Sequence, residues 1–264
     1  MDDLHAENHE AWEANAAVWD AKIDAEGNHF FRILCWPAML DLLGLQPGQR
    51  VLDIGCGNGL TSRKLAELSA EVTAFDFSAN LIALAKGYHT PHSSRITYQV
   101  ADATDETALL QWGLSTFDAA FSNMVLFDIS DIELLFRTLP KLLKPGGIFV
   151  FSIIHTAFNT ATSVHIAEEA GDEGRIKPLY SIKVSHYMTP YMARDLGLRN
   201  QPNLQVYYER PLQYYLNLAF RNGFVLDGFA ERAFPPDTPQ SYPLGWGGNY
   251  SEIPPVMVLR MRLL

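Results

Sequence analysis

The segment from Val51 to Gly59 constrains the fold more than any other part of the chain. It reads Val-Leu-Asp-Ile-Gly-Cys-Gly-Asn-Gly, so an apolar, β-rich run ends in an acid and three alternating glycines. This pattern predicts a strand that enters a turn, and a helical pattern begins at Leu60. Glycines at every second position permit positive φ angles and let the backbone approach a bound molecule closely. The segment therefore predicts a turn that binds a flat ligand of the adenosine type.

A dinucleotide-binding turn is disfavoured, because G-x-G-x-x-G would need a third glycine where Leu60 stands. The segment resembles instead the first motif of the class I S-adenosylmethionine-dependent methyltransferases. In that motif two hydrophobic residues, an acid and another hydrophobic residue precede G-x-G-x-G, and every fixed position matches. The resemblance implies S-adenosylmethionine as cofactor and methyl transfer as the reaction. Taken alone, the glycines also fit a tight turn that binds no ligand.

The composition indicates an ordinary soluble globular protein. Of the 264 residues, 48% are hydrophobic and 19% charged, and no apolar run reaches the roughly 18 residues of a membrane span. Cys35 and Cys56 are too few for a disulfide framework, and the acidic N-terminus lacks a secretory signal, so we expect a cytoplasmic protein. Because the net charge is −10 and Arg194, Arg199 and Arg210 are scattered, nucleic acid is a disfavoured partner.

From residue 50 onward, short β-rich runs alternate with helical segments. This order predicts an α/β fold, a Rossmann-like, doubly wound and mostly parallel sheet of seven strands. We expect the strands at 50–54, 71–75, 96–100, 117–122, 147–154, 224–230 and 253–263. We also expect a single domain over 1–264, composed of N-terminal cap helices at 1–45, a cofactor-binding core at 50–155, a lid or substrate insertion at 156–209, and a C-terminal helix and strands at 210–264.

Ligands of such a sheet bind beyond the carboxyl ends of its strands, where the strand order reverses. Asp76 follows the second strand at about the 20-residue distance expected of a ribose-binding acid, although it also suits a helix cap. The resemblance implies that Asp102 and Ala103, after the third strand, read the adenine. It also implies that the segment at Asn123, after the fourth strand, lies under the methionine part of the cofactor. Asn123 is equally suited to a turn.

The residues expected to contact the cofactor lie on the first helix, in the glycine turn and at the next three strand ends. Trp19 and Phe77 would offer aromatic faces to the positive sulfonium, although both also suit a hydrophobic core. No metal is expected to take part. The full set of cofactor contacts is Trp19, Asp53, Gly55, Cys56, Gly57, Asn58, Gly59, Asp76, Phe77, Ser78, Asp102, Ala103, Thr104, Asn123, Met124 and Val125.

Methyl transfer is an in-line displacement at a sulfonium carbon, so the protein mainly aligns the nucleophile and excludes water. A general base is needed only for a hydroxyl or a protonated amine. His155, expected at the end of the fifth strand and facing the methyl donor, is the leading candidate, and a purely structural histidine is the alternative. His186, Tyr187 and Glu209 are weaker candidate bases. The residues expected to contact the substrate are Phe127, Phe158, His186 and Tyr187.

The insertion at 156–209 is rich in aromatic side chains, which suit either a lid over a small organic acceptor or a dimer surface. The sequence therefore predicts transfer of a methyl group to an O, N or C atom of a small organic molecule, by a monomer or homodimer. Two alternatives stay open. The first is methylation of a modified tRNA base, which the acidic charge disfavours, and the second is cofactor binding without catalysis.

Overall fold

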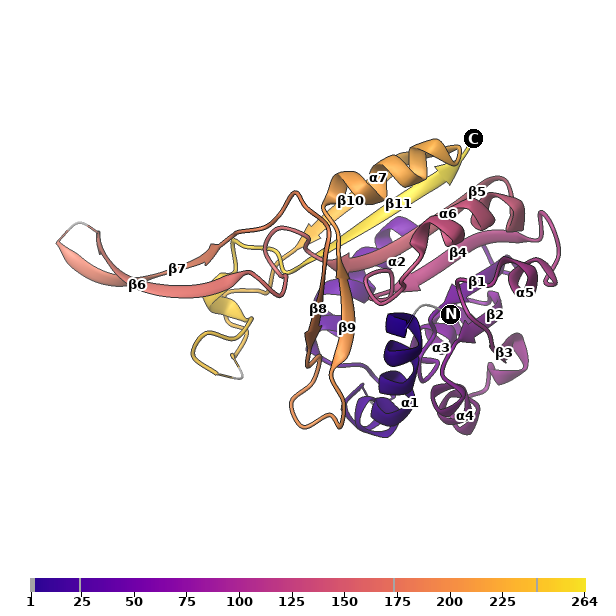
Figure 1. Ribbon diagram of the computed structural model, residues 1–264, viewed down its shortest axis with the longest axis horizontal. Helices are drawn as coiled ribbons and strands as arrows, with labels where there is room; N and C mark the ends of the chain where they lie inside the picture. The colour runs from indigo at the N-terminus through magenta and orange to yellow at the C-terminus, as the bar shows by residue number, and fades with distance from the viewer. Residues whose placement is uncertain (1–2, 24, 173, 241) are drawn as a thin grey trace.

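The computed structural model describes residues 3–23, 25–172, 174–240 and 242–264. Its centre is a seven-stranded sheet in the order β10-β11-β5-β4-β1-β2-β3 (Figure 1). The β-strands are parallel except β11, which runs antiparallel to both β5 and β10. The predicted mostly parallel sheet is thus confirmed. Its strands are β1 (Arg50–Ile54), β2 (Glu71–Asp76), β3 (Ile96–Val100), β4 (Phe117–Asn123), β5 (Leu143–Ile154), β10 (Phe224–Arg232) and β11 (Val256–Leu263).

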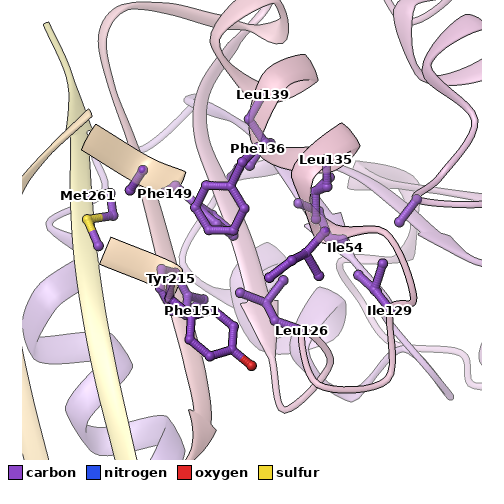
Figure 2. Close-up of a cluster of buried hydrophobic side chains, with 14 of the residues drawn as sticks. Ile54, Leu126, Ile129, Leu135, Phe136, Leu139, Phe149, Phe151, Tyr215 and Met261 are labelled. Atoms are coloured by element: carbon purple, nitrogen blue, oxygen red, sulfur yellow. The ribbon is translucent and has the colours of Figure 1, made fainter. Parts of the chain in front are cut away.

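Helices cover both faces of the sheet, as a doubly wound fold requires. One buried cluster joins the sheet to α5 (Glu106–Leu110), α6 (Ile132–Leu142) and α7 (Leu212–Arg221), and Figure 2 shows Phe136 of α6 beside Phe149 and Phe151 of β5. A second cluster joins the other face to α2 (Trp36–Leu43), α3 (Leu60–Glu67) and α4 (Ala79–Gly87). Burial of this apolar surface is the main stabilising contribution to the fold.

The N-terminal segment forms α1 (Asp3–Ile23), and a π-helical turn, η1 (Phe30–Cys35), leads directly into α2. Two short 3₁₀ turns complete the helical elements, η2 (Ser93–Arg95) and η3 (Gly248–Tyr250). No helix among the described residues is both long and apolar enough to cross a membrane. Because strand order reverses between β1 and β4, the carboxyl ends of these two neighbours are where a ligand is expected.

The segment expected to lack a regular pattern, residues 156–209, contains two β-hairpins. The first pairs β6 (Val164–Asp172) with β7 (Arg175–Lys183), and the second pairs β8 (Tyr191–Asp195) with β9 (Gln205–Glu209). The β6–β7 arm extends away from the body, whereas β8–β9 lies against α1 (Figure 1). Most of β7 and β8 is exposed or half-buried. These strands therefore lack the regular apolar alternation from which sequence reasoning finds a strand.

Candidate cofactor and acceptor site

A cavity of about 980 Å³ lies at the carboxyl ends of β1, β2, β3 and β4. Side chains of α1 and of the β8–β9 hairpin form other walls of the same space. Ligand pockets commonly measure about 300–1,000 Å³, so this cavity has room for a nucleoside-sized ligand and a second small molecule.

The three glycines after β1 meet different surroundings. Each has a positive φ, at 64°, 54° and 77° for Gly55, Gly57 and Gly59. A Cβ added to Gly55 would lie 2.5 Å from a methyl carbon of Val125, and one on Gly59 would lie 2.4 Å from the hydroxyl of Tyr98. A Cβ on Gly57 would meet no described atom within 4 Å, because this residue faces the cavity. Only Gly57 therefore combines the strained backbone with open space in front of it.

Asp53 lies beneath this turn and supports it. Its Oδ2 accepts hydrogen bonds from the hydroxyls of Thr61 and Ser62, at 2.7 and 2.6 Å, in the first turn of α3. The side chain is fully buried and does not line the cavity. Burial raises the pKa of Asp53 to about 7, and the two hydroxyls only partly oppose this rise. In this structure Asp53 fixes the start of α3 rather than facing the cavity.

Asp76, at the end of β2, lines the cavity and holds the glycine turn. Its Oδ2 accepts from the Gly57 N–H and its Oδ1 from the Ser78 N–H, each at 2.9 Å. Burial raises the pKa of Asp76 to about 6, although these two N–H groups favour the charged form. A carboxylate oxygen can accept more than one hydrogen bond, so both oxygens keep capacity for the two hydroxyls of a ribose. Its placement fits a nucleoside ligand.

Asp102, after β3, also lines the cavity and is held from both sides. Its Oδ1 accepts from the backbone N–H and the hydroxyl of Thr104, both at 2.8 Å, and its Oδ2 lies 2.6 Å from Nε2 of His5. Burial alone would raise the pKa of Asp102, but the hydrogen bonds from His5 and Thr104 outweigh it and lower the pKa. Asp102 is therefore an ionised acceptor that lines the same cavity as Asp76.

The chain was compared with known proteins. Residues 52–151 match a family model described as a methyltransferase domain. The chain is 37% identical over 114 residues to phosphoethanolamine N-methyltransferase of Triticum aestivum, covering 43% of this chain and 22% of the relative. It is 34% identical over 140 residues to ubiquinone biosynthesis O-methyltransferase of Xanthomonas campestris pv. campestris, covering 52% and 56%. The chain thus spans between about a fifth and somewhat over half the length of these curated relatives.

Among solved structures, the fold resembles an S-adenosylmethionine-dependent methyltransferase from Mesorhizobium loti. The TM-score is 0.66 at 25% identity, and the match covers 90% of this chain and all of the other. Over residues 52–151 the chain is therefore similar to a methyltransferase domain, and its fold matches that of a solved S-adenosylmethionine-dependent methyltransferase. The resemblance seen in the glycine motif is thereby confirmed for this part of the chain.

Most of the residues predicted to contact the cofactor line this cavity. Four predicted contacts lie behind its wall: Asp53 and Gly59 support α3, Ser78 caps α4 by accepting from the Leu81 N–H, and Thr104 orients Asp102. The predicted contacts that line it are Trp19, Gly55, Cys56, Gly57, Asn58, Asp76, Phe77, Asp102, Ala103, Asn123, Met124 and Val125.

Helix α1 carries site residues that sequence reasoning missed. His5 contacts Asp102, and the Asn8 side chain donates to the Asp128 carbonyl and accepts from the Val206 N–H of β9, at 2.9 and 3.0 Å. Trp12 packs on Trp19 with ring centroids 5.1 Å apart, and both rings line the cavity. The sequence of α1 shows polar residues between apolar ones. It does not show which residues they contact, because those residues are distant in the chain. This helix therefore joins the side of the cavity formed by Asp102 to the side formed by the β8–β9 hairpin.

Arg210 is a second residue missed by sequence reasoning. Its guanidinium donates to the carbonyls of Leu126, Ile129 and Ser130 at 2.8–3.2 Å, and the side chain is buried. These bonds fix the loop after β4, and the Tyr208 N–H of β9 donates to the Phe127 carbonyl of the same loop at 2.7 Å. The loop and β9 thus form one wall of the cavity.

This wall carries two buried acids. Asp128 and Glu209 are 7% and 6% exposed, and both line the cavity. Burial raises the pKa of Asp128 well above its ordinary value and also raises the pKa of Glu209. Tyr207 lies on the same wall, packs on Phe127 and donates its hydroxyl to Gln205 at 2.7 Å. Phe127 is thus the predicted substrate residue that does line the cavity.

The structure does not place His155 on the cavity wall. Its Nε2 hydrogen-bonds Oε1 of Glu231 at 2.9 Å, its Nδ1 accepts from the N–H groups of Ala157 and Phe158, and the Phe158 ring stacks on it. Burial lowers the pKa of His155 despite the nearby Glu231. The ring is therefore held against Glu231 of β10 instead of lining the cavity, and the role of His155 as a general base stays a prediction.

The other predicted substrate residues also lie off the cavity. The ring of Phe158 stacks on His155, and His186 is exposed and packs edge-on to Tyr191. The hydroxyl of Tyr187 accepts from the Leu212 N–H at the start of α7. Within the described residues, no three His, Cys, Asp or Glu side chains gather as a metal site would require. The absence of a metal requirement stays a prediction.

Proposed function

We propose that the chain catalyses methyl transfer from S-adenosylmethionine to an O, N or C atom of a small organic acceptor. The observation that carries the proposal is that one continuous cavity is lined both by Asp76 and Asp102 and by the wall that contains Asp128, Tyr207 and Glu209. Donor and acceptor would then meet in one space from which water is largely excluded.

The residues fit the cofactor as follows. The carboxylate of Asp76 would accept from the ribose hydroxyls, and Asp102 with the Ala103 N–H would bind the adenine edge. Gly57 gives the backbone room to approach the nucleoside. The bound cofactor supplies a methyl group on a positively charged sulfur. A lone pair of the acceptor would form the new bond to that methyl carbon while the carbon–sulfur bond breaks and its electron pair goes to sulfur. A hydroxyl acceptor would also release its proton to water, and an ammonium acceptor would release one to water before the attack.

The class of acceptor is supported by the enclosure of the cavity. Helix α1 and the β8–β9 hairpin both wall it, and Asn15 and Arg194 tie the two together through hydrogen bonds to Asn203 and Glu7. Such a roof admits small molecules more readily than a folded tRNA. The names of the relatives, an N-methyltransferase and an O-methyltransferase, also point to small acceptors.

The cellular setting is a further part of the proposal. Cys35 and Cys56 are both free and buried, which suits a reducing cytoplasm. We propose a single domain over 1–264, in which residues 156–209 serve as the lid, and a monomer or homodimer.

The cofactor proposal is tested by binding. S-adenosylmethionine should raise the melting temperature of the protein and NAD should not, because only a ligand of the folded state stabilises it. Replacement of Asp76 by Ala should weaken S-adenosylhomocysteine binding by about 100-fold, measured by calorimetry. The control is Asp118→Ala, because Asp118 lies at the opposite end of β4 beside Lys144 and Arg50. Equal affinities of the two variants would refute the assignment of Asp76.

Catalysis is tested by a screen of small metabolites with S-adenosylmethionine labelled at the methyl group. Label should move to at least one small acceptor with formation of S-adenosylhomocysteine. Firm cofactor binding without turnover on any acceptor would instead favour a binding module without catalysis.

A further inference from the structure

The acceptor wall of the cavity contains a buried carboxyl with an unused hydrogen-bonding atom. Asp128 is 7% exposed, lines the cavity, and its Oδ1 has no hydrogen-bond partner among the described residues. The indole N–H of Trp12 favours the charged form of this carboxyl, but it makes no hydrogen bond of standard geometry. A buried polar atom left in this state costs free energy, so it is a position that a ligand can satisfy.

A second buried carboxyl, that of Glu209, lines the same cavity. The backbone bond from Tyr208 N–H to the Phe127 carbonyl joins β9, which carries Glu209, to the loop after β4, which carries Asp128. Oε1 of Glu209 accepts from the Ala161 N–H at 3.0 Å, which leaves Oε2 for a ligand. Tyr207 lines the same cavity and packs on Phe127, the residue before Asp128. Two acids and an aromatic ring thus share one wall.

The positive charges lining the cavity do not neutralise these acids. Among the described residues, its Lys and Arg side chains are Lys22 and Arg32, and both are exposed. His5 is engaged by Asp102, and burial lowers the pKa of His165. Arg210 lies next to Glu209 in sequence, but its guanidinium is bound to three carbonyls of the loop and does not line the cavity. An anionic group on an acceptor would therefore meet no buried cation.

Aromatic faces complete the surroundings. Trp12 and Trp19 pack together on one side of the cavity, and Phe127 and Tyr207 pack together on another. Aromatic faces attract a cation, and a carboxylate binds an ammonium group through charge-assisted hydrogen bonds. The combination suits a positively charged amine better than a neutral alcohol or an acid.

We propose that Asp128 and Glu209 form a subsite for the protonated amine of the methyl acceptor, so that the substrate class is small organic amines without an anionic group. This inference rests on the proposed function and specifies its acceptor. Asp128 supplies the unused Oδ1, Glu209 supplies Oε2, and the aromatic side chains surround the rest of the molecule. Asn8 and Arg210 act as positioning residues, since they hold the loop that presents Asp128.

The test uses the full chain saturated with S-adenosylhomocysteine and three probes of similar shape, 2-phenylethylamine, 2-phenylethanol and phenylacetate. Calorimetry should give an affinity for the amine at least about tenfold above those for the alcohol and the acid. Asp128→Asn should remove most of that preference, and Glu209→Gln should remove a smaller part. The control Glu252→Gln alters an exposed carboxyl that does not line the cavity, and it should change nothing.

Three outcomes would overturn the proposal. The first is equal affinity for amine and alcohol, and the second is no binding of any probe. The third is an Asp128→Asn variant that binds S-adenosylmethionine less tightly but keeps its affinity for S-adenosylhomocysteine and its amine preference, because Asp128 would then face the sulfonium. Binding of S-adenosylhomocysteine by each variant is measured first. Failure at that step counts against the proposed function, whereas failure of amine preference alone counts against this subsite.

Discussion

The two sides of the cavity are built in different ways. On the predicted cofactor side, groups that line the cavity stand at strand ends, since Asp76 ends β2 and Gly57 lies in the turn after β1, and Asp76 accepts from the N–H groups of Gly57 and Ser78. On the acceptor side, Asp128 is held by Asn8 and Arg210, which are 120 and about 80 residues away in the chain. A site made of neighbours in sequence leaves a motif, whereas a site made of distant segments does not. This difference can be tested by variants that disturb one side only.

The largest effect is expected from the glycine turn. Gly55→Ala should lower the free energy of unfolding by up to about 4 kcal/mol, because it adds a strained positive φ and a clash with Val125. Gly57→Ala should lower it by only about 1 kcal/mol, since its Cβ enters open space, yet it should abolish cofactor binding. Urea unfolding and calorimetry with S-adenosylhomocysteine measure the two quantities. Equal stability losses would contradict the distinction between the two glycines.

The next effect concerns pH. Because burial raises the pKa of Asp53 to about 7, the folded state holds a proton that the unfolded state releases near the ordinary carboxyl pKa. This group therefore stabilises the fold at low pH, and its contribution is lost as pH rises toward 7. Between pH 5 and pH 8, the wild type should lose about 3 kcal/mol relative to Asp53→Asn, which keeps an acceptor for Thr61 and Ser62. If the free energy of unfolding, measured with urea, changes with pH by the same amount in both proteins, the raised pKa of Asp53 is disproved.

The acceptor side should be sensitive to Arg210. Arg210→Met leaves three carbonyls without their donor, of which those of Leu126 and Ile129 are buried, so the free energy of unfolding should fall by about 2–3 kcal/mol. Turnover should fall further than affinity for S-adenosylhomocysteine, because the loop carrying Asp128 loosens. The comparison variant Arg95→Met breaks an exposed pair with Glu71 and should cost at most about 1 kcal/mol. If affinity for S-adenosylhomocysteine falls as steeply as turnover, a change on the acceptor side also disturbs the cofactor side, which contradicts the comparison.

The smallest effect is expected at His155. His155→Ala should cost about 1 kcal/mol of stability through loss of the Glu231 hydrogen bond, with kcat changed by less than about threefold. Steady-state kinetics with the acceptor found in the screen, together with thermal unfolding, measure this. A fall in kcat of about 100-fold at unchanged stability would restore His155 as the general base.

Sequence reasoning reached the sheet and the cofactor side because these follow local rules. The apolar run from Val51 and the alternating glycines predicted β1 and its turn, and the same periodicity located the other strands of the sheet to within a few residues. It missed the β6–β7 and β8–β9 hairpins because β7 and β8 are largely exposed and β9 is buried on both faces, so these strands show no alternation of apolar and polar residues. His155 was expected on the cavity because it follows β5, but a pairing with Glu231 of β10 decided where its ring lies.

By itself, the sequence determined the doubly wound sheet, the glycine turn and the acids at the ends of β2 and β3, because the period of a strand and the backbone freedom of glycine are properties of short segments. Only the tertiary structure decided what α1 packs against, that Asp128 and Glu209 line the same cavity, and that a side chain has open space in front of it at Gly57 but not at Gly55 or Gly59. These facts depend on contacts between distant segments, and burial among such contacts is what shifts pKa values and leaves one carboxyl oxygen free for a ligand.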